Sequence, residues 1–198
     1  MEKPLWQPSE KKKQNSLLED FSKFINFKSD KNFKNLWEWS VKNPEKFWSE
    51  FWDYSKVIGD KGKEIIKKNK IFNQVKFFPD SKINYAENIL KKKDENTAIH
   101  FLSEKGFEES ITWKKLYEKV CKFSAYLKTL DLKKGDRVAA YVPNKIESII
   151  CFLACAKNGI IWSSCSPDFG VQGVVDRFKQ INCFFIFSRA ALLNFGHP

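Results

Sequence analysis

The chain has 198 residues, of which 42% are hydrophobic and 16% aromatic. That content is enough for a packed core, which excludes a chain disordered throughout. The longest apolar stretch, residues 146–161, is interrupted by Glu147 and Lys157, so no segment reaches the ~20 apolar residues of a membrane-spanning helix. No apolar signal core follows the first residues, and we therefore expect a cytoplasmic protein.

The net charge is +11, from 35 Lys and Arg against 24 Asp and Glu. Such a balance can indicate nucleic-acid binding. The lysines, however, alternate with acidic residues in short runs, and arginine, which base and phosphate recognition favours, is rare. We therefore expect a solvated lysine-rich surface and no nucleic-acid partner. Lysines gathered on one face would favour the nucleic-acid binder instead.

The chain has five cysteines and no CxxC pair: Cys121, Cys151, Cys155, Cys165 and Cys183. Cys151 and Cys155 fall four residues apart on a predicted helix, but no histidine lies near them in the sequence to complete a zinc site. We expect buried thiols in a reducing compartment and no metal site.

Residues 9–55 predict a helical layer. Ser9 can cap a first helix. Its apolar residues form one stripe: Leu17, Leu18, Phe21, Phe24 and Ile25. Residues 33–41 predict a second helix, and Pro44 suits the first turn of a third over residues 44–54.

The third predicted helix carries an aromatic face formed by Phe47, Trp48, Phe51 and Trp52. Such a face can stack nucleic-acid bases. We favour instead a helix that packs through this face onto a larger body. Exposed Trp48 and Trp52 side chains would indicate a different class, a non-catalytic module that docks on a partner protein.

Residues 59–84 show no regular pattern, and Asn84 can cap a short helix. Further on, residues 97–102 and 108–112 predict a hairpin that turns at Gly106. Thr112 then caps a helix whose apolar residues are spaced by three and four: Leu116, Val120, Phe123, Leu127 and Leu130.

Strands and helices alternate over the rest of the chain. Residues 137–142, 160–164 and 183–187 predict strands, and residues 146–158 and 172–180 predict helices between them. Gly159 can end the first of these helices in the left-handed conformation. Apolar strands separated by helices indicate parallel pairing, so we expect residues 137–142 and 160–164 to be parallel neighbours in an α/β fold.

The helix predicted over residues 146–158 is apolar on most sides, which requires cover from more than one layer. The chain offers few further elements to cover it. We therefore expect half an α/β domain, with Ile149, Ile150, Leu153 or neighbouring apolar groups exposed.

The sequence has no complete catalytic motif. Its two histidines, His100 and His197, lie apart, and neither a G-x-S-x-G elbow nor an H-E-x-x-H motif occurs. A glycine-rich phosphate loop followed by lysine is also missing. From the residues alone, the chain is a scaffold without a catalytic site.

Residues 111–178 resemble the opening of the adenylate-forming acyl-CoA ligases. The element KKGDRVAAYVPN, at residues 133–144, is typical of that superfamily. The loop WSSCSPDFG, at residues 162–170, followed by VVDRF, resembles the acetoacetyl-CoA synthetases within it. Earlier segments agree with their N-terminal region: PLWQPS at residue 4, FWSEFWDY at residue 47 and NYAEN at residue 84.

The resemblance implies an α/β fold: a helical N-terminal layer and the first strands and helices of a mixed or parallel sheet, in an incomplete ligase domain. It also implies a two-step reaction. Acetoacetate and ATP, with Mg²⁺, form an acyl-adenylate, and the thiol of coenzyme A (CoA) then displaces AMP. The phosphate loop, the nucleotide-binding motifs and the catalytic lysine of the family have no counterpart here. We therefore expect a fragment that is inactive alone and binds none of these substrates tightly.

One family site has a counterpart in this sequence. In related enzymes the loop after the strand at residues 160–164 borders the channel for the pantetheine arm of CoA. The resemblance thus makes Pro167, Asp168, Phe169 and Gly170 candidates for the CoA channel. The alternative is a plain turn in which Gly170 supplies a positive φ.

We divide the chain into an N-terminal helical region over residues 1–90, the start of the ligase domain over 91–181 and an atypical tail over 182–198. The last eleven residues resemble nothing expected of the family at that point, which favours a truncated or frame-shifted reading frame.

Overall fold

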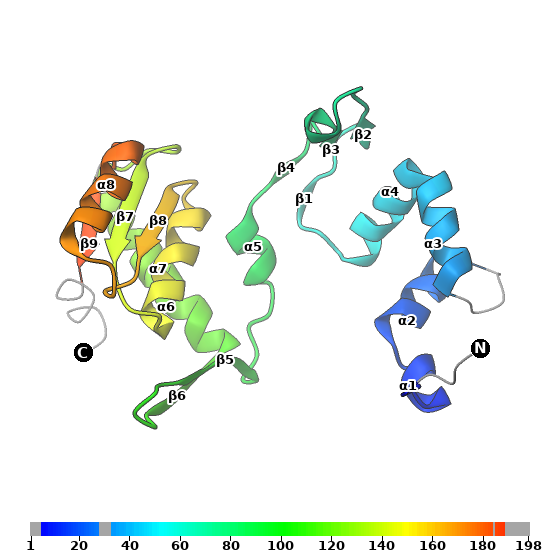
Figure 1. Ribbon diagram of the computed structural model, residues 1–198, viewed down its shortest axis with the longest axis horizontal. Coiled ribbons are helices and arrows are strands. Elements are labelled where there is room, and N and C mark those ends of the chain that lie inside the picture. The colour runs from blue at the N-terminus through cyan, green and yellow to red at the C-terminus, as the bar shows by residue number, and fades with distance from the viewer. Residues whose placement is uncertain (1–4, 28–32, 184, 189–198) are drawn as a thin grey trace. The chain divides into compact units, whose positions relative to one another are not determined.

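The computed structural model describes residues 5–27, 33–183 and 185–188 (Figure 1). Pro4 and most of the predicted tail, including His197, lie outside the described residues. The chain divides between Ile83 and Asn84 into two compact units, each described by itself below.

The first unit begins with helices, as predicted. They are α1 (Glu10–Gln14), α2 (Leu17–Phe24), α3 (Phe33–Lys42) and α4 (Pro44–Tyr54). The expectation of one helix after Ser9 was wrong, because the chain breaks between α1 and α2. The Ser16 hydroxyl accepts a hydrogen bond from the Glu19 amide at 3.2 Å and donates one to the Lys13 carbonyl at 2.7 Å. Ser16 thus serves the end of one helix and the start of the next.

An aromatic cluster joins α2 to α4. The buried Phe21 ring makes edge-to-face contacts with Phe47, Phe51 and Tyr54 at centroid distances of 5.8, 5.9 and 5.1 Å. This arrangement is favourable for aromatic pairs and comes in addition to the burial of their apolar area.

The other side of the α4 aromatic face packs within the same unit. The ring of Trp52 is buried against Phe78 at 4.8 Å, and the half-buried Trp48 contacts Phe77 at 5.1 Å. The helix is therefore docked through its aromatic face, as expected. Trp48 and Trp52 do not form the exposed patch on which the interaction-module hypothesis depends.

Residues 59–83, expected to be irregular, contain two short antiparallel ladders. Strand β1 (Gly59–Asp60) pairs with β4 (Lys82–Ile83), and β2 (Ile66–Lys67) pairs with β3 (Lys76–Phe77) around a 3₁₀ turn, η1 (Phe72–Gln74). Gly59 has a φ of +147°, and a Cβ there would lie 2.6 Å from the Lys82 carbonyl oxygen. The first ladder therefore requires glycine at this position.

The second unit alternates helices and strands. In chain order they are α5 (Tyr85–Ile89), β5 (Thr97–Leu102), β6 (Glu108–Thr112), α6 (Trp113–Thr129), β7 (Arg137–Tyr141), α7 (Ile146–Lys157), β8 (Ile161–Cys165), α8 (Val171–Ile181) and β9 (Phe185–Ser188). Asn84 caps α5 and Thr112 caps α6, as predicted, each accepting a hydrogen bond from the amide three residues later. Strands β5 and β6 form the predicted hairpin.

A parallel sheet in the order β8-β7-β9 lies at the centre of this unit. Arg137 pairs with Ile161 and Tyr141 with Cys165, so the prediction of parallel neighbours is confirmed. Successive side chains of β7 enter two separate clusters. Val138 and Ala140 pack in the cluster that contains α6 and α7, whereas Ala139 packs with Phe178 of α8. Helices therefore cover both faces of the sheet (Figure 1).

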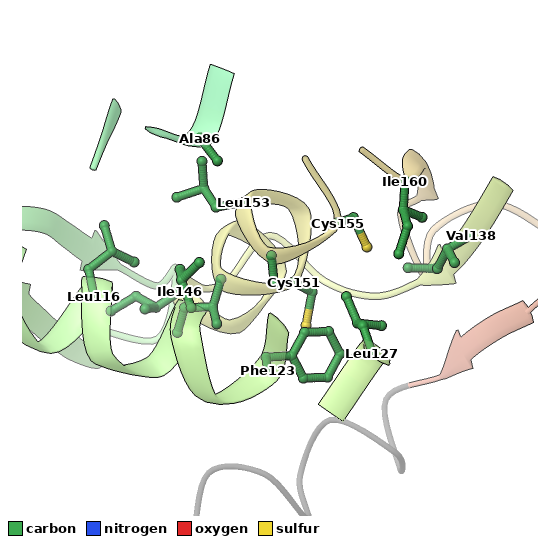
Figure 2. Packing of buried hydrophobic residues seen from close by; sticks show 14 of the residues in the cluster. Ala86, Leu116, Phe123, Leu127, Val138, Ile146, Cys151, Leu153, Cys155 and Ile160 are labelled. Atoms are coloured by element: carbon green, nitrogen blue, oxygen red, sulfur yellow. The ribbon is translucent and has the colours of Figure 1, made fainter. Parts of the chain in front are cut away.

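Helix α7 lies between α5, α6 and the sheet and is largely buried. Ile150 and Leu153 are buried, and only Ile149 is 38% exposed. Figure 2 shows Leu153 facing Ala86 of α5, while Cys151 lies beside Phe123 of α6. Of the apolar groups expected to be exposed, Ile149 is exposed, whereas Ile150 and Leu153 are buried, since the short helix after Asn84 packs on α7.

The carboxyl end of α7 is fixed by polar contacts. The Asn158 side-chain amide donates to the Ser124 carbonyl at 3.1 Å, and the Ser124 hydroxyl donates to Asn158 Oδ1 at 3.0 Å. Gly159 has the predicted positive φ, +71°, and a Cβ there would lie 2.9 Å from a side-chain carbon of Lys134. The helix therefore ends at a set point, from which β8 enters the sheet.

Two thiols of α7 lie in the apolar core. Burial raises the pKa of Cys155 to about 12, and burial, together with the neighbouring Cys155 and Glu147, raises that of Cys151 to about 12. Cys121 and Cys183 are partly exposed. No helix in the described part of the chain is long and apolar enough to cross a membrane.

Replacing Leu116 by alanine tests the contact between α6 and α7. Leu116 is 2% exposed, so Leu116→Ala should lower the free energy of unfolding of the second unit by about 2–5 kcal/mol. The matched control Leu102→Ala, at a residue 61% exposed, should change it by less than about 0.5 kcal/mol. Urea unfolding followed through amide signals of residues 113–157 measures both, and equal effects would contradict the packing described above.

Thiol labelling at pH 8 tests the burial of α7. With a pKa near 12, only about 10⁻⁴ of each Cys151 or Cys155 thiol is ionised at this pH, and the thiolate is the reactive form. A thiol reagent with peptide mass spectrometry should therefore modify Cys121 and Cys183 first. In denaturant Cys151 and Cys155 should react as fast as the others. Labelling of Cys151 at the rate of Cys121 in the native protein would show that α7 is uncovered.

Candidate functional site

The loop of residues 166–170 connects β8 to α8 and contains all four residues proposed from the resemblance. It follows the carboxyl end of a parallel strand, the edge at which open α/β sheets bind their ligands. Pro167, Asp168, Phe169 and Gly170 are all exposed, and the Phe169 ring is 41% accessible. The sheet thus presents these four residues to solvent at one edge.

Hydrogen bonds within the loop close a tight turn. The Ser166 hydroxyl donates to Asp168 Oδ2 at 2.6 Å, and the Phe169 amide donates to the Ser166 carbonyl at 3.2 Å. Gly170 precedes α8 with a φ of −61°, so the hypothesis that it supplies a positive φ was wrong. A Cβ at Gly170 would meet no atom within 4 Å. Neither backbone conformation nor packing therefore demands glycine here.

Tyr141, at the end of β7, attaches the loop to the sheet. Its hydroxyl lies 2.8 Å from the Pro167 carbonyl oxygen and 3.3 Å from that of Phe169, and it can donate to either. Each carbonyl belongs to a residue proposed for the CoA channel. A single side chain from the neighbouring strand therefore fixes the path of the loop.

Arg177, in α8, also contacts the loop. Its guanidinium carbon lies 4.2 Å from the centroid of the Phe169 ring, a cation–π contact, and its Nη1 donates to the Gly173 carbonyl at 3.1 Å. Sequence reasoning identified neither Tyr141 nor Arg177 as part of the site. The available signal for both was position, because the end of β7 and the first turns of α8 must lie beside the loop after β8.

The loop offers binding groups but no catalytic constellation. Ser166 and Asp168 form a hydroxyl–carboxylate pair, but a serine nucleophile also needs a base such as histidine to activate it. His100 lies on β5, where its Nδ1 is 2.8 Å from the Ser110 hydroxyl across the hairpin. Among the described residues, no three His, Cys, Asp or Glu side chains gather to hold a metal ion. The arrangement can position a ligand through an aromatic ring, a carboxylate and the start of α8.

Two protein families match the chain in sequence. Residues 86–195 match the family described as "AMP-binding enzyme". Residues 33–89 match "Acetyl-coenzyme A synthetase N-terminus".

Individual proteins are similar to this chain over most of its length. The chain is 36% identical to an acetoacetyl-CoA synthetase of Macaca fascicularis over 97% of its length, and 37% identical to that of Rhizobium meliloti over 91%. It is also 32% identical to a malonamoyl-CoA synthetase of Penicillium aethiopicum over 85%. The chain spans 29, 28 and 25% of the length of these relatives, respectively.

The fold agrees with the sequence. The solved acetoacetyl-CoA synthetase of Streptomyces lividans superposes with a TM-score of 0.84 over 94% of this chain and 30% of its own, at 28% identity. These likenesses cover both units and the loop between β8 and α8. The chain therefore belongs to the AMP-binding enzyme family and is a homologue of the acetoacetyl-CoA synthetases within it.

Proposed function

We propose that this chain provides the N-terminal part of an ATP-dependent acid–CoA ligase that acts on acetoacetate. The observation that carries the proposal is the 36–40% identity to acetoacetyl-CoA synthetases over 83–98% of the chain. An enzyme of this kind belongs in the cytoplasm, where its substrates are available. Within it, residues 1–90 form the helical N-terminal region, residues 91–181 begin the ligase domain, and residues 182–198 form a tail of different character.

The proposed reaction has two steps. The carboxylate oxygen of acetoacetate attacks the α-phosphorus of ATP, and pyrophosphate leaves to give acetoacetyl-AMP. The CoA thiol then loses its proton and attacks the acyl carbon, and AMP leaves with the electron pair of the broken C–O bond. Mg²⁺ accompanies the triphosphate in such enzymes, but the described residues of this chain form no metal-binding cluster, and we assign it no step here.

The role that we propose for this chain in the second step is to border the channel for the pantetheine arm. Pro167, Asp168, Phe169 and Gly170 form that border. The exposed Phe169 ring gives the arm an apolar wall, and Arg177 prevents the ring from turning away. The Pro167 and Phe169 carbonyls lie within reach of the Tyr141 hydroxyl, which leaves the Asp168 carboxylate and the uncapped start of α8 for polar contacts.

A different short acid is the second candidate for the acyl group. The malonamoyl-CoA synthetase relative, at 32% identity, favours a substrate in which an amide replaces the methyl ketone. Comparing the rates of acyl-CoA formation from acetoacetate and malonamate by a complete ligase whose N-terminal part is this chain decides between them.

The 198-residue chain by itself should form no AMP. The sequence has no glycine-rich phosphate loop followed by lysine, and the reaction requires groups that hold the triphosphate. Incubating the purified chain with ATP, Mg²⁺, acetoacetate and CoA should yield AMP at the rate of a no-enzyme control. Turnover clearly above that control would contradict the proposal that this chain needs the rest of a ligase to catalyse the reaction.

A chimera tests the proposed loop. Residues 5–188 of this chain would replace the matching 30% of the Streptomyces lividans enzyme, which its TM-score of 0.84 makes feasible. Phe169→Ala should raise the KM for CoA about fivefold, because an aromatic contact contributes about 1 kcal/mol, and should leave the KM for acetoacetate unchanged.

The control for that chimera is Phe107→Ala, another exposed phenylalanine, in the β5–β6 turn, which should change neither KM. An active chimera in which Phe169→Ala leaves the KM for CoA unchanged would remove the loop from the CoA channel. A chimera that folds but makes no acyl-CoA, beside an active parent enzyme, would count against the ligase function itself.

A further inference from the structure

Three lysines gather over two aromatic rings in the second unit. The Lys93 and Lys157 ammonium nitrogens lie 4.2 and 5.9 Å from the centroid of the Tyr117 ring, and that of Lys92 lies 5.8 Å from the Trp113 ring. The lysines come from two separate segments, the connection after α5 and the last turn of α7, and the rings from the start of α6. We call Lys93, Lys157 and Tyr117 the lysine–tyrosine cluster.

The cluster carries uncompensated positive charge. Among the residues that the structure describes, no carboxylate oxygen lies within 4.0 Å of the Lys92, Lys93 or Lys157 ammonium group. A nearby carboxylate, Glu95, is engaged by Lys114 at 2.8 Å. Hydrogen bonding to Glu95 and the charges of Glu95 and Glu118 raise the pKa of Lys114, so these carboxylates act on that lysine.

The terminal carbonyls of the helix beside Lys157 already accept hydrogen bonds from another residue. A cation in the last turn of a helix is ordinarily stabilised by the terminal carbonyls. Here the neutral Asn84 amide donates to the Ala156 carbonyl at 2.9 Å and lies 3.3 Å from that of Lys157. The Lys157 ammonium nitrogen instead lies 5.9 Å from the centroid of the Tyr117 ring, which Lys93 also contacts. Two like charges that share one ring repel each other, and an anion beside both would remove that repulsion.

We propose that the lysine–tyrosine cluster binds the phosphate group of a small phosphorylated molecule. Lysine ammonium groups bind phosphate as point charges, and cation–π contact with the Tyr117 ring restrains both Lys93 and Lys157. The site is distinct from the loop of residues 166–170. It adjoins the carboxyl end of α7, where the Gly135 amide bonds the Gly159 carbonyl and β7 and β8 begin, whereas the loop follows the end of β8.

Titration of the whole chain with inorganic pyrophosphate, at constant ionic strength, tests the site. Nuclear magnetic resonance signals of Tyr117 and of residues 92–93 and 157 should shift and saturate. Lys93→Gln and Lys157→Gln should each weaken the affinity about fivefold, the effect of one ammonium group close to the anion in water. Both side chains are exposed, so neither variant should alter folding, which thermal unfolding monitors.

The matched control is Lys114→Gln, which removes the same charge from the same part of the surface but from a lysine engaged with Glu95. It should weaken pyrophosphate binding less than about twofold. Equal loss of pyrophosphate affinity in all three variants would contradict the proposal, and so would signal shifts that spread over all lysines without saturation. Either result would show that pyrophosphate is attracted only by the general positive charge of the surface. Binding of a single-stranded oligonucleotide through the same lysines, without binding of pyrophosphate, would overturn the small-molecule proposal in favour of nucleic acid.

Discussion

Helix α7 is apolar on nearly every side, and its burial holds the second unit together. It contacts α6 on one side and α5 on another, and both neighbouring strands lead into or out of it. Side chains such as Leu153 and Ile150 each contribute about 1.5–3 kcal/mol when they are fully buried. Against a net stability of about 5–15 kcal/mol, a few such residues decide whether the unit folds. The short helix α5 matters for this reason, since it covers a side of α7 that would otherwise meet water.

The same helix determines where the loop of residues 166–170 lies. Gly159 and the Ser124–Asn158 hydrogen bonds fix the end of α7, and the end of α7 fixes where β8 starts beside β7. With Arg137 paired to Ile161, Tyr141 comes level with Cys165, one residue before the loop. Its hydroxyl then reaches the Pro167 and Phe169 carbonyls. The position of the loop therefore follows from core packing two elements away.

The sequence predicted those helices and strands whose capping residues and apolar spacing lie within the element itself. Helix α4 was predicted over its observed bounds, because Pro44 and the aromatic spacing both lie within it. The break at Ser16 was missed, because one serine between two helices is also compatible with a continuous helix. The ladders formed by β1 with β4 and β2 with β3 were missed as well. Each of these strands is only two residues long, and its partner lies nine or more residues away in the sequence. A strand this short shows no alternation of apolar and polar residues from which it could be predicted.

The candidate site could be predicted only in part, because some of its contacts join residues that lie far apart in the sequence. The resemblance identified the loop, but the side chains that hold it come from β7 and α8. Tyr141 looks like an ordinary residue of an apolar strand, and Arg177 like one charge on an amphipathic helix. Only the register of β7 with β8 brings Tyr141 to the loop. Likewise, the apolar character of α7 was evident from the sequence, whereas its cover by α5 depends on Asn84 reaching residue 156.

The chemical groups in the loop of residues 166–170 suit the part of the substrate that does not vary between acids. An aromatic ring, a carboxylate and a helix start can position a flexible arm with amide groups, and the pantetheine arm is the same in every acyl-CoA product. A segment that contacts this arm is under no constraint from the acyl group. Relatives that make acetoacetyl-CoA and malonamoyl-CoA both match this stretch of chain, at 36 and 32% identity. On the function proposed above, selection between acids therefore depends on residues outside this loop, whereas the loop serves the step that all of these ligases share.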